Sequence, residues 1–215
     1  TMWLEDGMHE RTDGNIRENG VPEDPVNTLG YLKTFFTWLP KISEALELDE
    51  EKRTKWQEIA QNLAPYPKGT IREIQENPTL WKEVDVKLED LLPQEMLDKE
   101  IYYDEGVGGK WSFHFPGNIM HIYPGNAVGL GSAQKELEVA RNTVHIHSLV
   151  ENKLGELEYK KALERASDEK KETAVKHAHF YKAGAFNASN LSCLFFTAAV
   201  RTGYDPDIIW KEMRI

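Results

Sequence analysis

Apolar side chains recur at three- and four-residue spacing in several stretches of the chain, which is the period of an amphipathic α-helix. The first stretch predicts one long helix over residues 26–47, with Asp24 as its N-cap and a bend at Pro40. A second helix is expected to begin at Asp49, and its apolar stripe consists of Trp56, Ile59, Ala60 and Leu63. These two segments are expected to form a helical hairpin.

The second half of the chain carries the same helical period. Ser132 is expected to cap a helix over residues 133–150, and the charged segment 151–176 is helical by propensity. Residues 187–202 are hydrophobic on nearly all sides, which predicts a central, buried helix. An Asp-Pro pair begins a last helix over 206–215. The pattern therefore predicts an all-α fold of helical hairpins.

Residues 66–130 lack this period and contain many proline and glycine residues. A short helix is expected between Asp90 and Met96, and the rest is expected to be a long irregular connection. Residues 1–24 are interrupted by glycine and are also expected to be loop. Loops of this length in a compact domain are often functional.

Composition excludes several classes of protein. The 215-residue chain is 40% hydrophobic and carries a net charge of −10, so it can form a core but does not attract nucleic acid or an anionic membrane surface. It has no apolar run long enough to span a bilayer. Cys193 is the only cysteine, so no intrachain disulfide forms, and it is expected to be a small buried hydrophobe.

Glu10 is the first candidate for catalysis. It lies in a glycine-rich loop between His9 and Arg11, where a desolvated carboxyl group would have a raised pKa and could act as a general acid. The alternative is a solvated surface glutamate paired with Arg11, and the spacing of these residues alone favours that alternative.

Residues 111–126 form the second candidate site. This segment interleaves aromatic rings, imidazoles and amides, a mixture that suits a sugar because rings stack on its C–H face while polar groups bond its hydroxyls. The candidate substrate-binding residues are Trp111, His114, His121 and Tyr123. The equally weighted alternative is a short buried strand with alternating Trp111, Phe113 and Phe115. The two histidines match no common metal-ligand spacing, so no metal is expected.

Three stretches of the chain resemble the later part of the catalytic domain of family 95 glycoside hydrolases, the alpha-L-fucosidase type, and of related uncharacterised bacterial proteins. The first is the loop containing Glu10, which precedes a long helix. The second is a helix-pair motif that runs from Leu46-Glu47-Leu48-Asp49-Glu50-Glu51 through Arg53-Thr54-Lys55-Trp56 to Leu63-Ala64-Pro65-Tyr66. The third is a histidine-containing loop that ends in Tyr123-Pro124-Gly125-Asn126 and precedes a helix with Ala140-Arg141. The likeness covers residues 8–145, with looser agreement to residue 215.

This resemblance implies part of an (α/α)6 toroid and inverting hydrolysis of a glycosidic bond. In such a reaction one carboxyl group protonates the leaving oxygen while a base activates water on the opposite face. Glu10 would be the general acid. The sugar pocket would be lined by His9, Trp111, His114, His121 and Tyr123. The resemblance implies no cofactor.

The chain departs from the family in its catalytic base. The family's Asp-Gly-Asn motif lies downstream, whereas Asp13-Gly14-Asn15 follows directly after Glu10. An acid without its base is not expected to turn over substrate by this route. We therefore also consider a sugar-binding remnant without turnover and a helical binding or scaffold module without catalysis.

The ends of the chain lead to expectations about its context. The opening residues 1–7 lack the basic and apolar regions of a signal peptide, and the last residues lie within an expected helix. Residues 1–215 are therefore expected to be a single domain that is a fragment of a longer protein. The sequence leaves the localisation open, and a periplasmic or secreted parent protein is one of the alternatives. The expected partners are an oligosaccharide and, through exposed helix faces, further copies of the chain.

Overall fold

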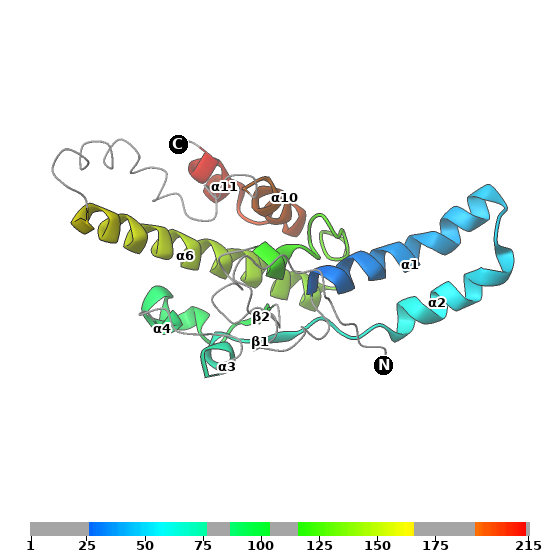
Figure 1. The fold of residues 1–215 in the computed structure, drawn as a ribbon, viewed down its shortest axis with the longest axis horizontal. Helices are drawn as coiled ribbons and strands as arrows, with labels where there is room; N and C mark the ends of the chain where they lie inside the picture. Colours follow the sequence, from blue (N-terminus) through cyan, green and yellow to red (C-terminus); the bar gives the residue numbers. More distant parts are fainter. Residues whose placement is uncertain (1–25, 77–86, 104–115, 166–191, 214–215) are drawn as a thin grey trace.

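The computed structural model describes residues 26–76, 87–103, 116–165 and 192–213, and within them the protein is mostly helical with one small sheet (Figure 1). The α-helices are α1 (Val26–Leu46), α2 (Arg53–Asn62), α3 (Ile71–Glu76), α4 (Leu88–Leu91), α6 (Gln134–Arg165), α10 (Ser192–Thr202) and α11 (Pro206–Met213). The 3-10 helices are η1 (Glu50–Lys52), η2 (Gln94–Met96) and η3 (Pro116–Ile119), and the strands are β1 (Lys68–Thr70) and β2 (Glu100–Tyr102).

The long helices agree with the hydrophobic pattern. Helix α1 matches the expected segment 26–47 and continues through Pro40, which is buried. The segments expected over 133–150 and 151–176 form one uninterrupted helix, α6, as far as Arg165. Before α11, Asp205 accepts a hydrogen bond from the Asp207 N–H at 2.9 Å, which confirms the expected N-cap.

Two other expected caps are wrong. Asp49 has a left-handed backbone with φ of 51° and makes no capping hydrogen bond, because its carboxylate pairs with Lys52 at 2.5 Å. The Ser132 hydroxyl accepts a hydrogen bond from the Gly129 N–H at 3.1 Å, within the loop that precedes α6. Both side chains therefore stabilise the turn between elements.

The small sheet corrects the expectation of an irregular connection over residues 66–130. Strands β1 and β2 pair antiparallel, with Gly69 opposite Ile101. Directly after β1, Thr70 and Glu73 exchange hydrogen bonds at the first turn of α3, which is the reciprocal pattern of a capping box. Each strand is three residues long, too short to give an alternating sequence pattern.

Helix α6 joins two hydrophobic clusters (Figure 1). One cluster gathers residues from α1, the segment after η3, α10 and α11, and α6 contributes Val139, Ala140 and Val144 to it. The other lies under α3 and α4, and α6 contributes Ile146 and Val150. A single helix thus holds both ends of the described core together.

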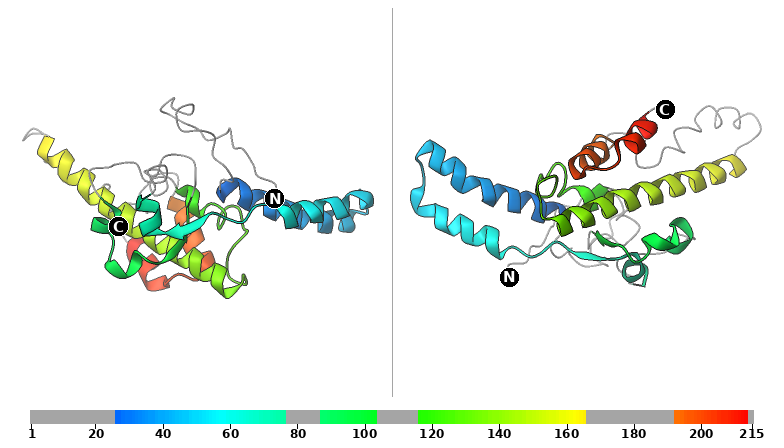
Figure 2. Two further views of the ribbon diagram at one scale, coloured as in Figure 1. Left: turned by 90° about the horizontal axis from the view of Figure 1, so that it is seen from below. Right: turned by 180° about the vertical axis from the view of Figure 1, so that it is seen from behind.

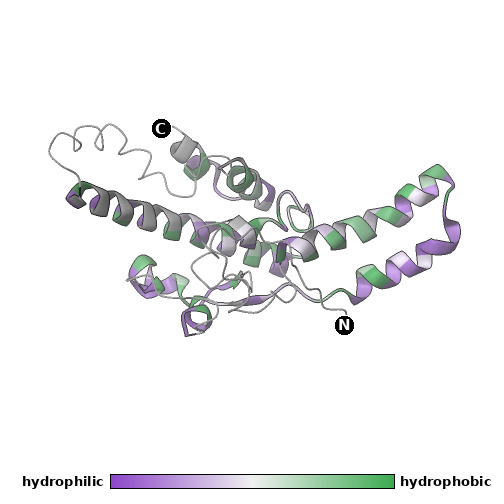
Figure 3. Ribbon diagram, in the orientation of Figure 1, coloured by the Kyte–Doolittle hydropathy of each residue, from purple (hydrophilic) through white to green (hydrophobic). Residues whose placement is uncertain are grey.

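The hairpin of α1 and α2 projects away from this core in all three views (Figures 1 and 2). The beginning of α1 is buried at Val26 and Leu29, whereas α2 has no buried residue. Exposed apolar residues of α1, among them Phe35 and Ile42, lie along the projecting part. Green segments alternate with purple and white ones along this helix in Figure 3. The core therefore holds the hairpin mainly by the N-terminal end of α1.

Candidate binding pocket beside helix α1

Only part of the candidate site lies within the described residues. His9, Glu10, Trp111 and His114 fall outside them, so their mutual arrangement is not described. His121 and Tyr123 are described, and both belong to the segment that connects η3 to α6. Their surroundings define the candidate site.

His121 lies in the core, fully buried between two tyrosine rings. Its ring centroid is 4.8 Å from that of Tyr66 and 4.4 Å from that of Tyr102. Both imidazole nitrogens lack a hydrogen-bond partner in the described part of the chain. His121 therefore supports the inner side of Tyr66 and has no surface of its own to offer a ligand.

Close packing against α1 fixes the backbone at His121. A Cβ added at Gly30 would lie 2.5 Å from the His121 Cβ, and one at Gly125 would lie 2.8 Å from the Met120 carbonyl oxygen. The Thr34 hydroxyl donates a 2.5 Å hydrogen bond to the Gly125 carbonyl. Glycine at position 30 lets the loop lie directly on α1, and glycine at position 125 lets the loop fold back closely on its own backbone at Met120 and His121.

Burial controls the protonation of this cluster. Desolvation, with a smaller effect of the nearby Lys33 ammonium, lowers the pKa of His121 to about 3, so its imidazole is neutral at pH 7. Burial raises the pKa of both Tyr66 and Tyr102, and the Glu136 carboxylate adds to each shift. The two phenols are therefore protonated near neutral pH and can donate hydrogen bonds.

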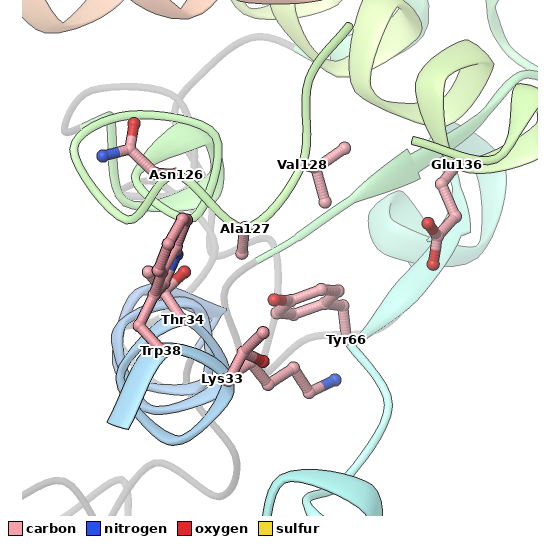
Figure 4. A pocket seen from close by; sticks show the side chains of 9 residues that line it. Lys33, Thr34, Trp38, Tyr66, Asn126, Ala127, Val128 and Glu136 are labelled. Atoms are coloured by element: carbon pink, nitrogen blue, oxygen red, sulfur yellow. The ribbon is translucent and has the colours of Figure 1, made fainter. Parts of the chain in front are cut away.

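A pocket of about 240 Å³ opens beside this cluster, between α1, the loop after Gly125 and the start of α6. Its lining residues are Lys33, Thr34, Thr37, Trp38, Tyr66, Asn126, Ala127, Val128 and Glu136. In Figure 4, Trp38 projects from α1 on one side, Glu136 lies on the other, and the Tyr66 ring lies between them. The pocket thus combines two aromatic rings with charged and hydroxyl groups.

Opposite charges flank the Tyr66 ring in this pocket. The Lys33 Nζ lies 3.9 Å from the ring centroid, a cation–π contact (Figure 4). Glu136 lines the pocket from the start of α6. An ammonium group donates hydrogen bonds and a carboxylate accepts them, so the walls suit a neutral ligand rich in hydroxyl groups.

Tyr123 lies near the pocket but is not among the residues that line it. It is half-buried against the larger hydrophobic cluster. Its phenol raises the pKa of Tyr31, a shift caused mainly by burial of Tyr31. The substrate-binding role expected for Tyr123 stays a prediction.

In the glycine-rich turn before α6, three of the backbone donors that a phosphate would need are already used within the protein. The Gly129 N–H donates to Ser132 Oγ, the Leu130 N–H to the Arg201 carbonyl at 2.7 Å, and the Ser132 N–H to the Gly129 carbonyl at 2.9 Å. The turn therefore serves to join α6 to α10.

The two histidines of α6 are spaced two residues apart, which favours helix-surface positions over a shared ligand site, but the structure places both at least half in the interior. His147 is buried and stacks on Phe195 with ring centroids 5.8 Å apart. His145 is half-buried and forms a 2.5 Å hydrogen bond with the Tyr204 hydroxyl, and burial lowers its pKa. In the described ranges, no group of three His, Cys, Asp or Glu residues could hold a metal ion.

The sequence patterns missed most of the pocket. Lys33, Trp38 and Glu136 were seen only as helix positions, and about 100 residues separate the first from the last. Tyr66 gave a usable signal, because it ends the Leu-Ala-Pro-Tyr motif. The role of the other residues depends on how α1 meets α6, which the local pattern does not contain.

Fold and site together define the protein as a mostly helical one with a small two-stranded sheet and a small aromatic pocket. Among the described residues, none of the helices has both the length and the apolar character that crossing a bilayer requires. A scan of family models gives no match for the chain, and searches of curated proteins and of solved structures also give none. The functional argument therefore depends on the residues themselves.

Proposed function

We propose that the protein binds a single sugar ring of an oligosaccharide in the pocket beside α1. The observation that carries this proposal is the pairing of Trp38 and Tyr66 with Lys33 and Glu136 around a small volume. Aromatic faces suit the C–H face of a pyranose, and the charged groups suit its hydroxyls. The volume of about 240 Å³ lies below the usual range for drug-sized ligands, in keeping with one ring.

The motif resemblance supports a more detailed form of the proposal. In that form the helical hairpins belong to an (α/α)6 toroid like that of family 95 glycoside hydrolases. Glu10 is then the general acid of an inverting hydrolysis, and His9, Trp111 and His114 extend the sugar site. Because the sequence lacks a matching base, we infer sugar binding with little or no turnover by the isolated chain.

Sugar binding can be tested on the full chain by isothermal titration and NMR chemical-shift mapping with a panel of monosaccharides and oligosaccharides that includes L-fucose. Trp38→Ala and Glu136→Gln are each expected to weaken binding at least about tenfold, because the first removes an aromatic wall of the pocket and the second removes the carboxylate that accepts hydrogen bonds from hydroxyl groups. The matched control is Trp210→Ala, since Trp210 is as exposed as Trp38 and lies on α11.

Two results would overturn this assignment. One is the absence of binding by any sugar of the panel at millimolar concentration. The other is an equal loss of affinity in the Trp210→Ala control, which would show that the Trp38 effect is not local to the pocket.

The catalytic part has a separate test with aryl glycosides. Any hydrolysis by the chain is expected to fall by about 10² or more in Glu10→Gln, because general acid catalysis contributes a factor of this order. An unchanged rate would remove Glu10 from the mechanism and leave the sugar-binding proposal intact.

A helical interaction module without catalysis is the second candidate function. The observation that favours it is the exposed apolar face of α1, which includes Phe35, Trp38 and Ile42. This function does not require Glu10 or any sugar. It is compatible with the fold because the hairpin projects from the core (Figure 1).

A further inference from the structure

We propose that a second copy of this chain docks on the exposed apolar stripe of α1 and forms an antiparallel, two-fold symmetric helix pair. The stripe consists of Tyr31, Phe35, Trp38, Ile42 and Leu46. The proposal does not require sugar binding, although Trp38 belongs both to the stripe and to the pocket wall, so only stripe residues outside the pocket are used to test it. It concerns the outer face of the projecting hairpin.

The stripe is a separate face of α1, distinct from the one that packs on the protein. The buried positions of the helix are Val26, Leu29, Gly30, Pro40 and Ser43. At about 100° per residue, the centre of the stripe lies roughly half a turn from the centre of these positions. Helix α1 is thus apolar on two sides, and the described part of the chain covers only one of them.

The spacing of the stripe favours self-pairing. Tyr31, Phe35, Trp38 and Ile42 follow one another in steps of four, three and four, which is the heptad seam of a coiled coil. The order of steps reads the same in both directions. A two-fold axis midway between Phe35 and Trp38 therefore brings Phe35 opposite Trp38 of the second copy and Tyr31 opposite Ile42, as an isologous interface requires.

The exposed area is sufficient for a dimer. The stripe residues are 42–62% exposed, and the aromatic side chains among them carry about 150–250 Å² each. The five side chains therefore expose on the order of 500 Å² per copy, within the range of about 300–600 Å² for the largest apolar patch on a monomer, a patch that often serves as a binding surface. Complete burial of the stripe on both copies would remove about 1,000 Å² from solvent, the lower bound for a specific interface.

Charge also favours contact at this face. The chain has a net charge of −10, so two copies repel each other over most of their surfaces. Residues 26–43 contain no acidic side chain and include Lys33 and Lys41. Repulsion between copies is therefore weakest where the apolar stripe lies.

The test is sedimentation equilibrium of the full chain over a range of concentrations up to about 100 μM, where a micromolar dimer is populated. The wild-type chain is expected to dimerise. Phe35→Glu and Ile42→Glu are each expected to raise the dimer Kd at least about tenfold. Both residues are half-exposed in the single chain and neither lines the pocket, so their circular dichroism spectra should match the wild type.

The matched control is Val200→Glu, which introduces the same charge at an exposed apolar position of α10 and should leave the dimer intact.

The relative orientation of the two helices is tested with the double variant Tyr31→Cys, Ile42→Cys. These positions lie about 16 Å apart along one helix, so a disulfide between them joins two copies. The wild-type chain, with Cys193 alone, controls for other crosslinks.

Three outcomes would overturn the proposal. A chain that stays monomeric at the highest concentration leaves the stripe to another occupant. A dimer that persists in both glutamate variants uses another surface. Preferential crosslinking of the single variant Ile42→Cys to itself would indicate parallel helices and exclude the antiparallel axis.

Discussion

The two ends of helix α1 have opposite surroundings. At its beginning, Val26, Leu29 and Gly30 are buried, and Gly30 touches the backbone of His121. Farther along, Phe35, Trp38 and Ile42 are about half-exposed although they are as apolar as the residues of the core. The same helix therefore packs into the core at its beginning, whereas farther along it is buried on one side, at Pro40 and Ser43, and exposed on the other.

This contrast shows what an amphipathic pattern can and cannot establish. Apolar residues recur with the same helical spacing along the whole of α1. This spacing indicates that a helix has an apolar face, but it does not indicate what covers that face. Whether a given face is buried depends on residues that come from elsewhere in the chain. Here the segment after η3 covers the beginning of α1, while α2 covers one side of the rest.

The largest expected difference between the two regions is at a pair of phenylalanines. Phe195 of α10 is almost fully buried, so Phe195→Ala should lower the free energy of unfolding by about 3–5 kcal/mol. Phe35→Ala, at an exposed position of α1, should change it by less than about 0.5 kcal/mol. Urea denaturation followed by circular dichroism measures both, and similar losses would contradict the contrast drawn here.

A smaller loss is expected where α1 meets the loop. Gly30→Ala places a methyl group 2.6 Å from the His121 Cα, so the loop must move, at a cost of about 1–3 kcal/mol. Ala45→Leu, at the exposed end of the same helix, adds more volume and should have little effect. A neutral Gly30→Ala in urea denaturation would show that the loop does not lie on α1.

The sequence was sufficient to predict the long helices because each carries its own signals. Helix α11 is an example, since its start depends on Asp205 and Pro206, which are adjacent in the chain. The strands β1 and β2 gave no comparable signal because each is short and is stabilised by its distant partner. Tyr102 of β2, for instance, donates its N–H to Thr143 Oγ1 of α6 at 2.9 Å.

The sequence predicted the kinds of side chain in the candidate site, aromatic and polar together, but not most of the residues that supply them. The aromatic and polar mixture expected of residues 111–126 recurs in a pocket to which, among the described residues 116–126 of that segment, Asn126 alone contributes. His121 was expected at the surface of the site because its neighbours in the sequence are polar and aromatic. It is buried because Gly30 lets α1 approach its backbone, a contact between residues 91 positions apart.

The last prediction concerns pH and uses His121 as the probe of the core. In the unfolded chain its pKa is about 6.5, and in the folded protein burial lowers the pKa to about 3. Between these values the unfolded state binds a proton that the folded state does not. The contribution of His121 to stability is therefore fully present above pH 6.5 and is lost as the pH falls toward 3, by about 1.4 kcal/mol per pH unit within the window.

His121→Leu removes this titration and fills a similar volume between Tyr66 and Tyr102. Because neither imidazole nitrogen has a partner in the described part of the chain, the substitution should be nearly neutral at pH 8. Urea denaturation at a series of pH values should then show a flatter acid side for the variant. His145→Leu is the comparison, and a smaller change is expected from it since His145 is only half-buried. If wild type and His121→Leu lost stability in parallel from pH 6.5 to pH 4, the imidazole would have to be reachable by water, and the core described around it would be incorrect.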